Sequence, residues 1–398
     1  MATMKKIITT VLNKIKGLSP VRKKFMTHTF VLFLSLKGRM NFQNMSRIGK
    51  YSEKSYRLHF EKPFDFFTFN KLLIEQHCSE RRIIAGDCSY IPKSGKKTPH
   101  LGKFWNGCVS KPMNGLEISS LAVVDTDRNT AMHLECDQTP GNLNDDESRM
   151  DFYLRQVVGK KDGLKLLADY IVNDGAYAKK KYVDGIAEQT ELHLICKLRR
   201  DADLRYLYTG PRRTGRGRPK RYDGKINCKM IDKTRFDLCH TDDEKSVYTA
   251  VVNSKSLKRD IRIAYVESRK TDSYAILFST DTGISGDLIY RYYKARFQIE
   301  FLFRDAKQHT GLNHCQARSE NKLHFHFNTS LSAVSIARAE QILNGGASDR
   351  AFSMNNIKNL YFNRLFLDRF FEKSGISRTC KKISAAYDEL LNFGKIAA

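Results

Sequence analysis

The sequence lacks any apolar run long enough to cross a membrane. The stretch FVLFLSL at 30–36 is apolar, but a spanning helix takes about 20 such residues. The N-terminus, MATMKKIITTVLNKIKG, starts as a signal peptide would. Lys14 and Lys16 interrupt its apolar part, however, and no cleavage pattern follows. We therefore expect a protein with no membrane partner, whose first residues form a small amphipathic helix.

Paired cysteines are also missing. Nine cysteines are scattered along the chain without a CxxC pair. Cys228 with Cys239 and His240 is the nearest approach to a zinc half-site, and its spacing fits no common zinc finger. An odd cysteine count without a signal peptide indicates reduced thiols, and so a cytoplasmic protein.

Acidic residues are few relative to basic ones. The 398 residues include 69 Lys and Arg but only 43 Asp and Glu, which gives a net charge of +26. A hydrophobic fraction of 41% indicates a folded chain, long enough for two or three domains. Because such a charge repels itself, a polyanionic partner is expected, and without a membrane segment that partner is nucleic acid.

Residues 1–78 are predicted to be helical and strongly basic. The segment NFQNMSRIGKYSEKSYRLHF at 41–60 predicts two short helices that are broken at Gly49, with Ser52 as the N-cap of the second. This pattern resembles a helix-turn-helix, whose second helix enters the major groove of DNA. The side chains expected to face phosphates are Arg47, Lys50, Lys54, Tyr56 and Arg57. The alternative is a helical hairpin with a solvated basic face.

The middle of the chain predicts a mixed α/β sheet flanked by helices. Apolar runs at 81–91, 116–125 and 130–138 predict three adjacent antiparallel strands, and 147–160 predicts a helix. Further strands are expected at 166–174, 190–204, 246–252, 260–267 and 273–279. A helix is expected to begin near Gly286, and residues 320–398 are predicted to be helical.

The segment YTGPRRTGRGRPKRYDG at 208–224 interrupts this pattern. It is rich in Gly, Pro and Arg and nearly free of apolar residues, which is typical of a loop. Its guanidinium groups suggest a phosphate-binding arm formed by Arg212, Arg213, Arg216 and Arg218. A surface excursion without a ligand is the alternative.

A polar stripe runs along the apolar segment YYKARFQIEFLFRDAKQHTGL at 292–312. Tyr293, Arg296, Glu300 and Lys307 are offset by 3, 7 and 14 positions and would return to one face of a continuous helix. An ordinary i,i+4 ion pair between Arg296 and Glu300 would also explain the stripe.

Two aspartates favour a catalytic site over an ordinary Arg296–Glu300 ion pair. Asp87 and Asp174 each end an apolar strand, the position at which α/β folds build their sites. If the two strands are neighbours and the helix packs nearby, Glu300 joins them. Three converging carboxylates repel one another unless a cation lies between them, and hard oxygen ligands suit Mg²⁺ or Mn²⁺. Two such ions could support an in-line displacement at phosphorus.

Other candidate residues are predicted to be structural. Asp125 and Asp127 flank the turn of the predicted hairpin, and turn formation explains them. Asp281 is expected to help cap the helix that follows it. The other three are His309 and His314, predicted to be structural histidines with DNA contact as the alternative, and Trp105, predicted to lie in the core with DNA stacking as the alternative.

Taken together, these motifs resemble the DDE transposases of bacterial insertion sequences. The spacing Tyr293-x2-Arg296-x3-Glu300-x6-Lys307 matches the Tyr-Arg-Glu-Lys signature of that family. VNDGAYAKKKYV resembles its second-aspartate motif, and IIAGDCSYI resembles its first-aspartate strand. LICKLRRDADL resembles the strand before its insertion domain, and the resemblance spans roughly residues 40–370.

The resemblance implies an RNase H-like core that a mainly β insertion interrupts. The expected domains are a helical DNA-binding domain at 1–78, the first part of the core at 79–200, the insertion with its basic arm at 201–285, the glutamate helix of the core at 286–345 and a helical C-terminal region at 346–398. It also implies that Asp87, Asp174 and Glu300 hold two Mg²⁺ or Mn²⁺ ions. Tyr293, Arg296 and Lys307 match positions that contact transposon-end DNA.

The function expected from this resemblance is DNA transposition. The chain would bind terminal inverted repeats, cleave the ends and join the 3′-OH to target DNA, as a homodimer in the synaptic complex, in a bacterial cytoplasm near the nucleoid. Relatives hold a flipped base with an insertion-domain tryptophan. Here Trp105 lies outside the insertion, so Tyr206, Tyr208 or Tyr248 could stack in its place. The alternatives are an RNase H-like endonuclease without strand transfer and a non-catalytic DNA-binding regulator.

Overall fold

The computed structural model describes residues 2–143, 146–211, 218–345, 352–376 and 381–396. The chain forms two compact units. The first unit comprises Met1–Glu80, Cys88–Asn142 and Ile299–Ala398, and the second comprises Arg81–Asp87 and Leu143–Gln298. Within the described ranges, no helix combines the length and the apolar character that crossing a bilayer requires.

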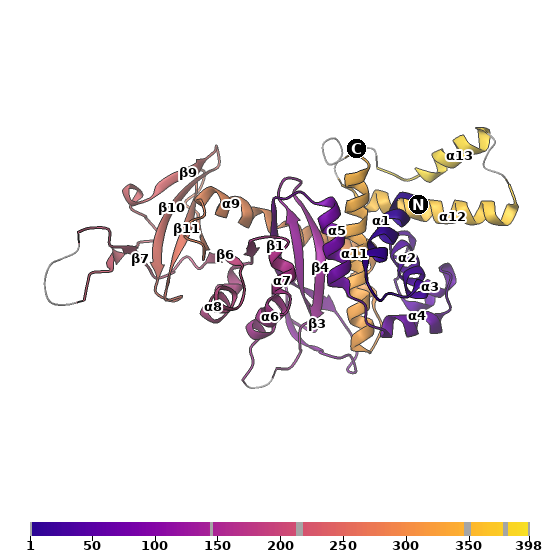
Figure 1. The fold of residues 1–398 in the computed structure, drawn as a ribbon, viewed down its shortest axis with the longest axis horizontal. Helices are drawn as coiled ribbons and strands as arrows, with labels where there is room; N and C mark the ends of the chain where they lie inside the picture. Colours follow the sequence, from indigo (N-terminus) through magenta and orange to yellow (C-terminus); the bar gives the residue numbers. More distant parts are fainter. Residues whose placement is uncertain (1, 144–145, 212–217, 346–351, 377–380, 397–398) are drawn as a thin grey trace. The chain divides into compact units, whose positions relative to one another are not determined.

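The first unit is built mainly of helices (Figure 1). Apolar side chains of the helices, among them Phe30, Phe69 and Phe325, are fully or almost fully buried and form its core. Phe30 stacks on Phe69 with ring centroids 4.8 Å apart. Its helices are α1 (Ala2–Lys14), α2 (Pro20–Ser35), α3 (Phe42–Ile48), α4 (Glu53–Glu61), α5 (Phe66–His77), α11 (Glu320–Leu343), α12 (Met354–Ser374) and α13 (Lys381–Leu391).

Three antiparallel strands complete the first unit. β3 (Lys111–Asp125) pairs with β2 (Gly102–Asn106) on one side and with β4 (Thr130–Gln138) on the other. α5 and α11 pack against β4 (Figure 1). The antiparallel pairing of β3 with β4 confirms the hairpin predicted around residues 116–138.

Buried polar side chains join α11 to β4. The Asn328 side-chain oxygen accepts a hydrogen bond from the Cys136 backbone N–H at 2.9 Å and lies 2.9 Å from His133 Nε2. The Asn328 amide donates to the carbonyl of Cys136 at 2.9 Å. Because these partners satisfy groups that water would otherwise solvate, a helix with polar residues on several sides can run through the core.

The second unit contains a longer mixed sheet. Its strands run in the order β1-β5-β6-β12-β11-β10-β7-β8, where β1 belongs to this unit as far as Asp87, and β9 pairs with β10. β1 pairs with β5 and β5 with β6 in parallel, whereas the β6–β12 pair and all later pairs are antiparallel. The bounds are β1 (Arg82–Pro92), β5 (Tyr170–Val172), β6 (His193–Leu198), β7 (Leu204–Leu207), β8 (Tyr222–Lys225), β9 (Asp237–Thr241), β10 (Lys245–Ser254), β11 (Arg259–Ser268) and β12 (Tyr274–Ser279).

One predicted strand is much shorter than expected. The apolar run at 166–174 contains only the three residues of β5, because its first residues close a turn after α7 (Lys161–Lys165). The backbone N–H groups of Leu167 and Ala168 both donate to the carbonyl of Leu164, at 2.9 and 3.1 Å. Two other helices flank this region, α6 (Arg149–Val158) and α8 (Lys180–Gln189), and they pack against each other.

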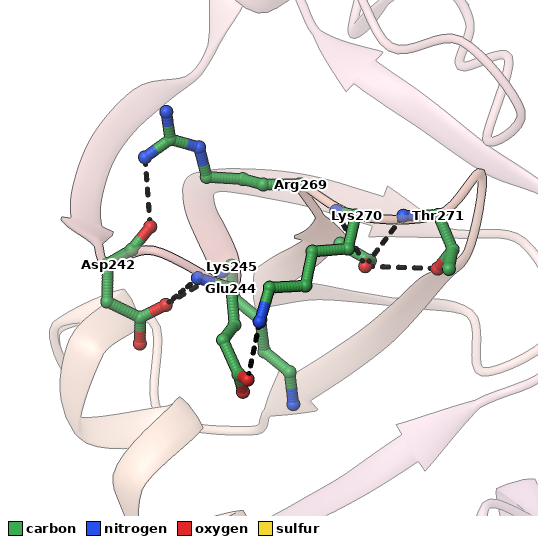
Figure 2. Close-up of polar contacts among 7 residues, drawn as sticks. Asp242, Glu244, Lys245, Arg269, Lys270 and Thr271 are labelled. Atoms are coloured by element: carbon green, nitrogen blue, oxygen red, sulfur yellow. Dashed lines mark hydrogen bonds and ion pairs between the residues drawn. The ribbon is translucent and has the colours of Figure 1, made fainter.

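Two turns at one end of the antiparallel strands are tied together (Figure 2). The carboxylate of Asp242 accepts hydrogen bonds from the backbone N–H groups of Glu244 and Lys245 at 2.8 and 2.7 Å, which closes the β9–β10 turn. Arg269, in the β11–β12 turn, donates to the Asp242 carbonyl at 2.9 Å, and Lys270 pairs with Glu244 at 2.9 Å. The basic side chains of this tip are thus partnered within the protein.

Candidate functional site

The parallel pairing of β1 with β5 brings two predicted site residues level with each other. Ile84 lies opposite Ile171, and Ala85 lies opposite Val172. Parallel partners advance in step and side chains alternate between faces. Two residues beyond the last pair, Asp87 is therefore level with Asp174 on the face that Ala85 and Val172 share. Both aspartates are half-buried.

The position of Asp87 differs from the prediction. The sequence suggested that it ends its strand, but β1 continues to Pro92, so Asp87 lies in the interior of the strand. The apolar run ends at Asp87 because burial changes there: residues 83–86 are buried, and 87–88 are half-buried. Asp174, which was predicted to end its strand, lies just beyond it, because β5 ends two residues earlier, at Val172.

Asn173 connects the two strands at the level of the aspartates. Its side-chain amide donates to the carbonyl of Gly86 at 2.9 Å, and its backbone N–H donates to Ile195 of β6 at 3.0 Å. The side chain is 1% exposed. Sequence reasoning missed this residue. The only available signal was an Asn directly before Asp174, where an apolar residue would have continued the buried strand.

Asp174 is held by its own backbone and by β6. Its carboxylate accepts a hydrogen bond from the Ala176 N–H at 2.9 Å and so caps the 3-10 turn Gly175–Tyr177. Its carbonyl oxygen accepts from the thiol of Cys196 at 2.7 Å. One carboxylate oxygen is thereby fixed in orientation, which positions the group without a long side chain having to be ordered.

Arg296 pairs with Asp87. The Arg296 guanidinium lies 3.1 Å from Asp87 Oδ2, and the two side chains are only 11% and 18% exposed. The Arg296 guanidinium carbon lies 5.8 Å from the ring centroid of Tyr293. Burial raises the pKa of Tyr293 to about 12, with a smaller contribution in the same direction from the negative charge of Asp174. Four predicted site residues thus lie close together in the second unit.

The helix that carries these residues is not continuous. α9 (Gly286–Ala295) begins at the predicted glycine, with Ser285 as its N-cap, but a turn at 296–297 separates it from α10 (Gln298–Asp305). At this turn the Phe297 N–H donates to Lys294, three residues back, at 3.3 Å. The Phe297 side chain is 47% exposed. The prediction of one uninterrupted helix is therefore wrong.

A second irregularity follows at the predicted lysine. Residues Ala306–Thr310 form a π-helical turn that contains Lys307. A π turn inserts an extra residue per turn and is frequent at functional sites. The break and the π turn both change the helical phase. Offsets of 7 and 14 positions from Tyr293 therefore no longer place Glu300 and Lys307 on one stripe. Lys307 is half-buried, and burial lowers its pKa.

Glu300 and Lys307 belong to the first unit, whereas Asp87, Asp174, Tyr293 and Arg296 belong to the second. Within the described ranges, no group of three or more His, Cys, Asp or Glu side chains lies in a metal-binding arrangement. The convergence of the three carboxylates therefore stays a prediction. The donor set itself fits the expected metal, since carboxylate oxygens are the ligands that Mg²⁺ and Mn²⁺ prefer.

The N-terminal helices follow the predicted pattern. α3 and α4 are separated at Gly49, and the Ser52 hydroxyl accepts a hydrogen bond from the Ser55 N–H at 3.2 Å as the N-cap of α4. A Cβ at Gly49 would clash with the Tyr56 hydroxyl and would lie 2.6 Å from the Met45 carbonyl oxygen, so glycine is required there.

The basic side chains of α3 and α4 differ in their surroundings. Arg47 and Lys54 are exposed. Arg57 is also exposed, but it pairs with Glu53 at 2.6 Å and lies over the ring of Phe42. Tyr56 is fully buried, so the prediction that it faces phosphates is wrong: the ring fills the core under α4, and the hydroxyl lies 2.7 Å from His28 Nε2.

The basic arm is described only in part. Arg212, Arg213 and Arg216 lie outside the described residues, and Arg218 is exposed. The three tyrosines considered for base stacking each lie under a cation. Arg235 lies 3.8 Å from the Tyr206 ring, Lys220 lies 4.6 Å from Tyr208 and Lys233 lies 4.9 Å from Tyr248, all measured to the ring centroid.

Trp105 is not a core residue, contrary to the prediction. It lies on β2 and is 59% exposed, whereas its neighbour Phe104 is fully buried. Alternation along the strand directs only one of the two rings into the protein, and Phe104 occupies that side. DNA stacking, the alternative for Trp105, stays a hypothesis.

Asp125 has the structural role that the sequence predicted. It is completely buried and accepts hydrogen bonds from the Ser79 N–H and hydroxyl, both at 2.8 Å, and from the Arg128 guanidinium at 2.7 Å. Burial raises its pKa, but these hydrogen bonds outweigh burial, so the pKa lies below its usual value. His314 is also structural, since its Nδ1 accepts from the Met40 N–H at 3.1 Å.

Comparison with known proteins identifies a family whose model matches the chain. The family model described as transposase DDE domain matches residues 119–336, more than half of the chain. This range contains Asp174 and Glu300, and Asp87 precedes it. The curated proteins searched contain no match. Among solved structures, the chain is similar to the cryo-EM structure of the piggyBac transposase synaptic complex with hairpin DNA, with 12% identity and a TM-score of 0.40 over 99% of this chain and 83% of that one.

Proposed function

The chain belongs to the transposase DDE domain family, and from this premise we propose that it cleaves the ends of a bacterial insertion sequence and joins them to target DNA. The observation that carries the proposal is the parallel pairing of β1 with β5, which brings Asp87 level with Asp174, two residues beyond β5, with Arg296 and Tyr293 beside them. An α/β sheet that presents two carboxylates and a buried guanidinium suits a phosphodiester substrate.

The residues proposed to hold metal are Asp87, Asp174 and Glu300. Two bound Mg²⁺ or Mn²⁺ ions would activate the attacking oxygen and stabilise the leaving oxygen. Asp174 keeps one oxygen on the Ala176 N–H at 2.9 Å and would direct the other outward. Arg296 pairs with Asp87 at 3.1 Å and so holds that carboxylate in place.

Arg296 and Tyr293 would position the DNA strand beside the carboxylates. A guanidinium offers donors on more than one edge, so Arg296 can hold Asp87 and still donate to a phosphate oxygen. The Tyr293 hydroxyl stays protonated at neutral pH, since its pKa is raised to about 12 by burial, and it can donate to a second phosphate oxygen. Lys307 would supply a further cation for the same strand.

Recognition of the element ends is proposed for the basic surfaces outside the site. The exposed Arg47, Lys54 and Arg57 on α3 and α4 suit a helix-turn-helix placed on DNA. The arm with Arg212, Arg213, Arg216 and Arg218 would follow the phosphate backbone. Because two ends must be joined to one target, a homodimer that holds both ends is expected, and the family resemblance suggests a hairpin intermediate.

A strand-transfer assay tests the proposed function. Linear DNA that carries one element end is incubated with the protein, supercoiled target plasmid and Mg²⁺. We expect end cleavage that leaves a 3′-OH, followed by covalent joining of the labelled end to the plasmid. Cleavage without joined products would indicate the endonuclease alternative. DNA binding with no cleavage in Mg²⁺ or Mn²⁺ would indicate a non-catalytic regulator.

A further inference from the structure

A pocket of about 790 Å³ lies within the first unit, and none of the residues assigned to catalysis lines it. Three segments that are distant in the sequence line it. They are Arg39 before α3, the segment 92–98 that follows β1, and the segment 313–318 (without residue 317) that precedes α11.

Two partly buried hydrogen bonds hold these segments together. The Lys93 ammonium donates to the carbonyl of Cys315 at 2.5 Å, which joins the segment after β1 to the one before α11. The backbone N–H beside Arg39, that of Met40, donates to His314 Nδ1 at 3.1 Å. His326, which is buried in α11, fixes the start of the same segment through a 2.8 Å hydrogen bond with the Gly311 carbonyl. Hydrogen bonds within the protein therefore join the segments that line the pocket.

The pocket lining carries only positive charge. Its lining includes no Asp or Glu, and its cations are Arg39, Lys93, Lys96, Lys97 and Arg318. Four of these, all except Lys93, are exposed and form no ion pair within the part of the chain that the structure describes. Burial lowers the pKa of Lys93, and the nearby positive charge of Arg318 lowers it further. Crowded cations of this kind are relieved by a bound anion.

We propose that this pocket binds a backbone phosphate of double-stranded DNA. The inference rests on the proposed function for the identity of its polyanion, since a transposase must hold DNA on both sides of the cleaved bond. Lys96 and Lys97, on the exposed segment after β1, and Arg318, on the opposite wall, would contact the phosphate. Lys93 would act as a positioning residue through its bond to Cys315.

A matched pair of basic residues elsewhere provides the control. Arg269 and Lys270 are also consecutive and exposed on a turn, but Arg269 donates to the Asp242 carbonyl and Lys270 pairs with Glu244 (Figure 2). Changing Lys96 and Lys97 to Gln removes two positive charges, and so does changing Arg269 and Lys270 to Gln. The two double variants therefore have the same net charge and differ in which surface has lost its cations.

The test is the salt dependence of binding to a short duplex of arbitrary sequence, in EDTA, so that no cleavage step enters. Each phosphate contact contributes about 0.9 to the slope of log K against log salt, which is roughly tenfold in affinity near 0.1 M salt. For Lys96→Gln with Lys97→Gln we expect a slope smaller by about 1 and binding roughly tenfold weaker, and for Arg318→Gln a change in the same direction. The Arg269→Gln, Lys270→Gln control is expected to keep the parent slope.

Equal losses of DNA affinity in both double variants would overturn the proposal, because net charge alone would then explain binding. No loss in the Lys96, Lys97 variant would also overturn it. Inorganic phosphate in the binding buffer separates the two sources of the same chemistry: millimolar phosphate that binds through Arg318 but leaves DNA binding unchanged would show a site for free phosphate only, contrary to the proposal. The two experiments are independent. A failed strand-transfer assay would not change the salt dependence of DNA binding, and a failed salt-dependence test would not contradict the catalytic assignment.

Discussion

Replacing Glu300 with Gln is expected to lower the rate of DNA end cleavage by on the order of 10³-fold, because the amide keeps the size of the side chain but loses the charge that a divalent cation needs. α10 should keep its fold, since Glu300 is only half-buried and Ile299, Leu302 and Phe303 supply the buried face. Single-turnover cleavage of labelled end DNA in Mg²⁺ measures the effect, and binding of the same DNA in EDTA should change little.

Glu320→Gln is the control for this variant. Glu320 has the same chemistry and lies in the first turn of α11, with its side chain 66% exposed beside His100. The Glu320→Gln variant should cleave DNA ends at the parent rate. If Glu300→Gln cleaved as fast as Glu320→Gln, Glu300 would not be a metal ligand, and the proposed site would lose its third carboxylate.

Replacing Asp125 with Ala is expected to lower the free energy of unfolding of the first unit by about 3 kcal/mol. The carboxylate is completely buried, and its loss leaves the hydrogen-bond donors of Ser79 and the guanidinium of Arg128 without their acceptor. Urea unfolding followed by circular dichroism at pH 7 measures the change. Asp127→Ala is the control, because Asp127 lies two residues away in the same turn and is exposed.

The effect of Asp125→Ala should depend on pH in a defined direction. The folded-state pKa of Asp125 is lowered, since the hydrogen bonds from Ser79 and Arg128 outweigh burial. A lowered folded-state pKa contributes stability that is present above the unfolded-state pKa of about 3.9 and is lost as pH falls through the folded-state value. The difference in the free energy of unfolding between parent and variant should therefore be full at neutral pH and shrink below about pH 4. A constant difference down to strongly acidic pH would contradict this account.

Elements with strong local signals were predictable from the sequence. β3, β4, β10, β11 and β12 coincide with alternating or apolar runs, and α9 begins at Gly286 because Ser285 caps it. Asp174 could be identified because the apolar run of its strand ends just before it, with only Asn173 between Val172 and Asp174. These features depend on neighbours within a few residues, which a single sequence displays directly.

Features that depend on distant partners were not predictable. The buried Asn328 in α11 is explained only by Cys136 and His133 on β4. The exposure of Trp105 follows from which face of β2 is covered, and that is decided by packing rather than by hydrophobicity. The pocket around Lys93 combines three segments whose proximity leaves no pattern in the sequence.

The helix break after Ala295 shows a third kind of difficulty. A 3.6-residue period continues across residues 292–312, so the sequence predicts one helix. The turn at 296–297 and the π turn at Ala306–Thr310 each change the backbone by a single residue, which hydrophobic periodicity does not resolve. Both irregularities fall at or beside residues proposed for the site.

The central claim is that Asp87, Asp174 and Glu300 share bound metal, and iron-directed cleavage of the polypeptide tests it most directly. Fe²⁺ takes the place of Mg²⁺ in the protein–DNA complex, and ascorbate with peroxide then generates radicals that cut the chain beside the metal. The account predicts cuts next to all three residues in the same sample, each suppressed by excess Mg²⁺. Cuts near Asp87 and Asp174 without any near Glu300 would contradict it.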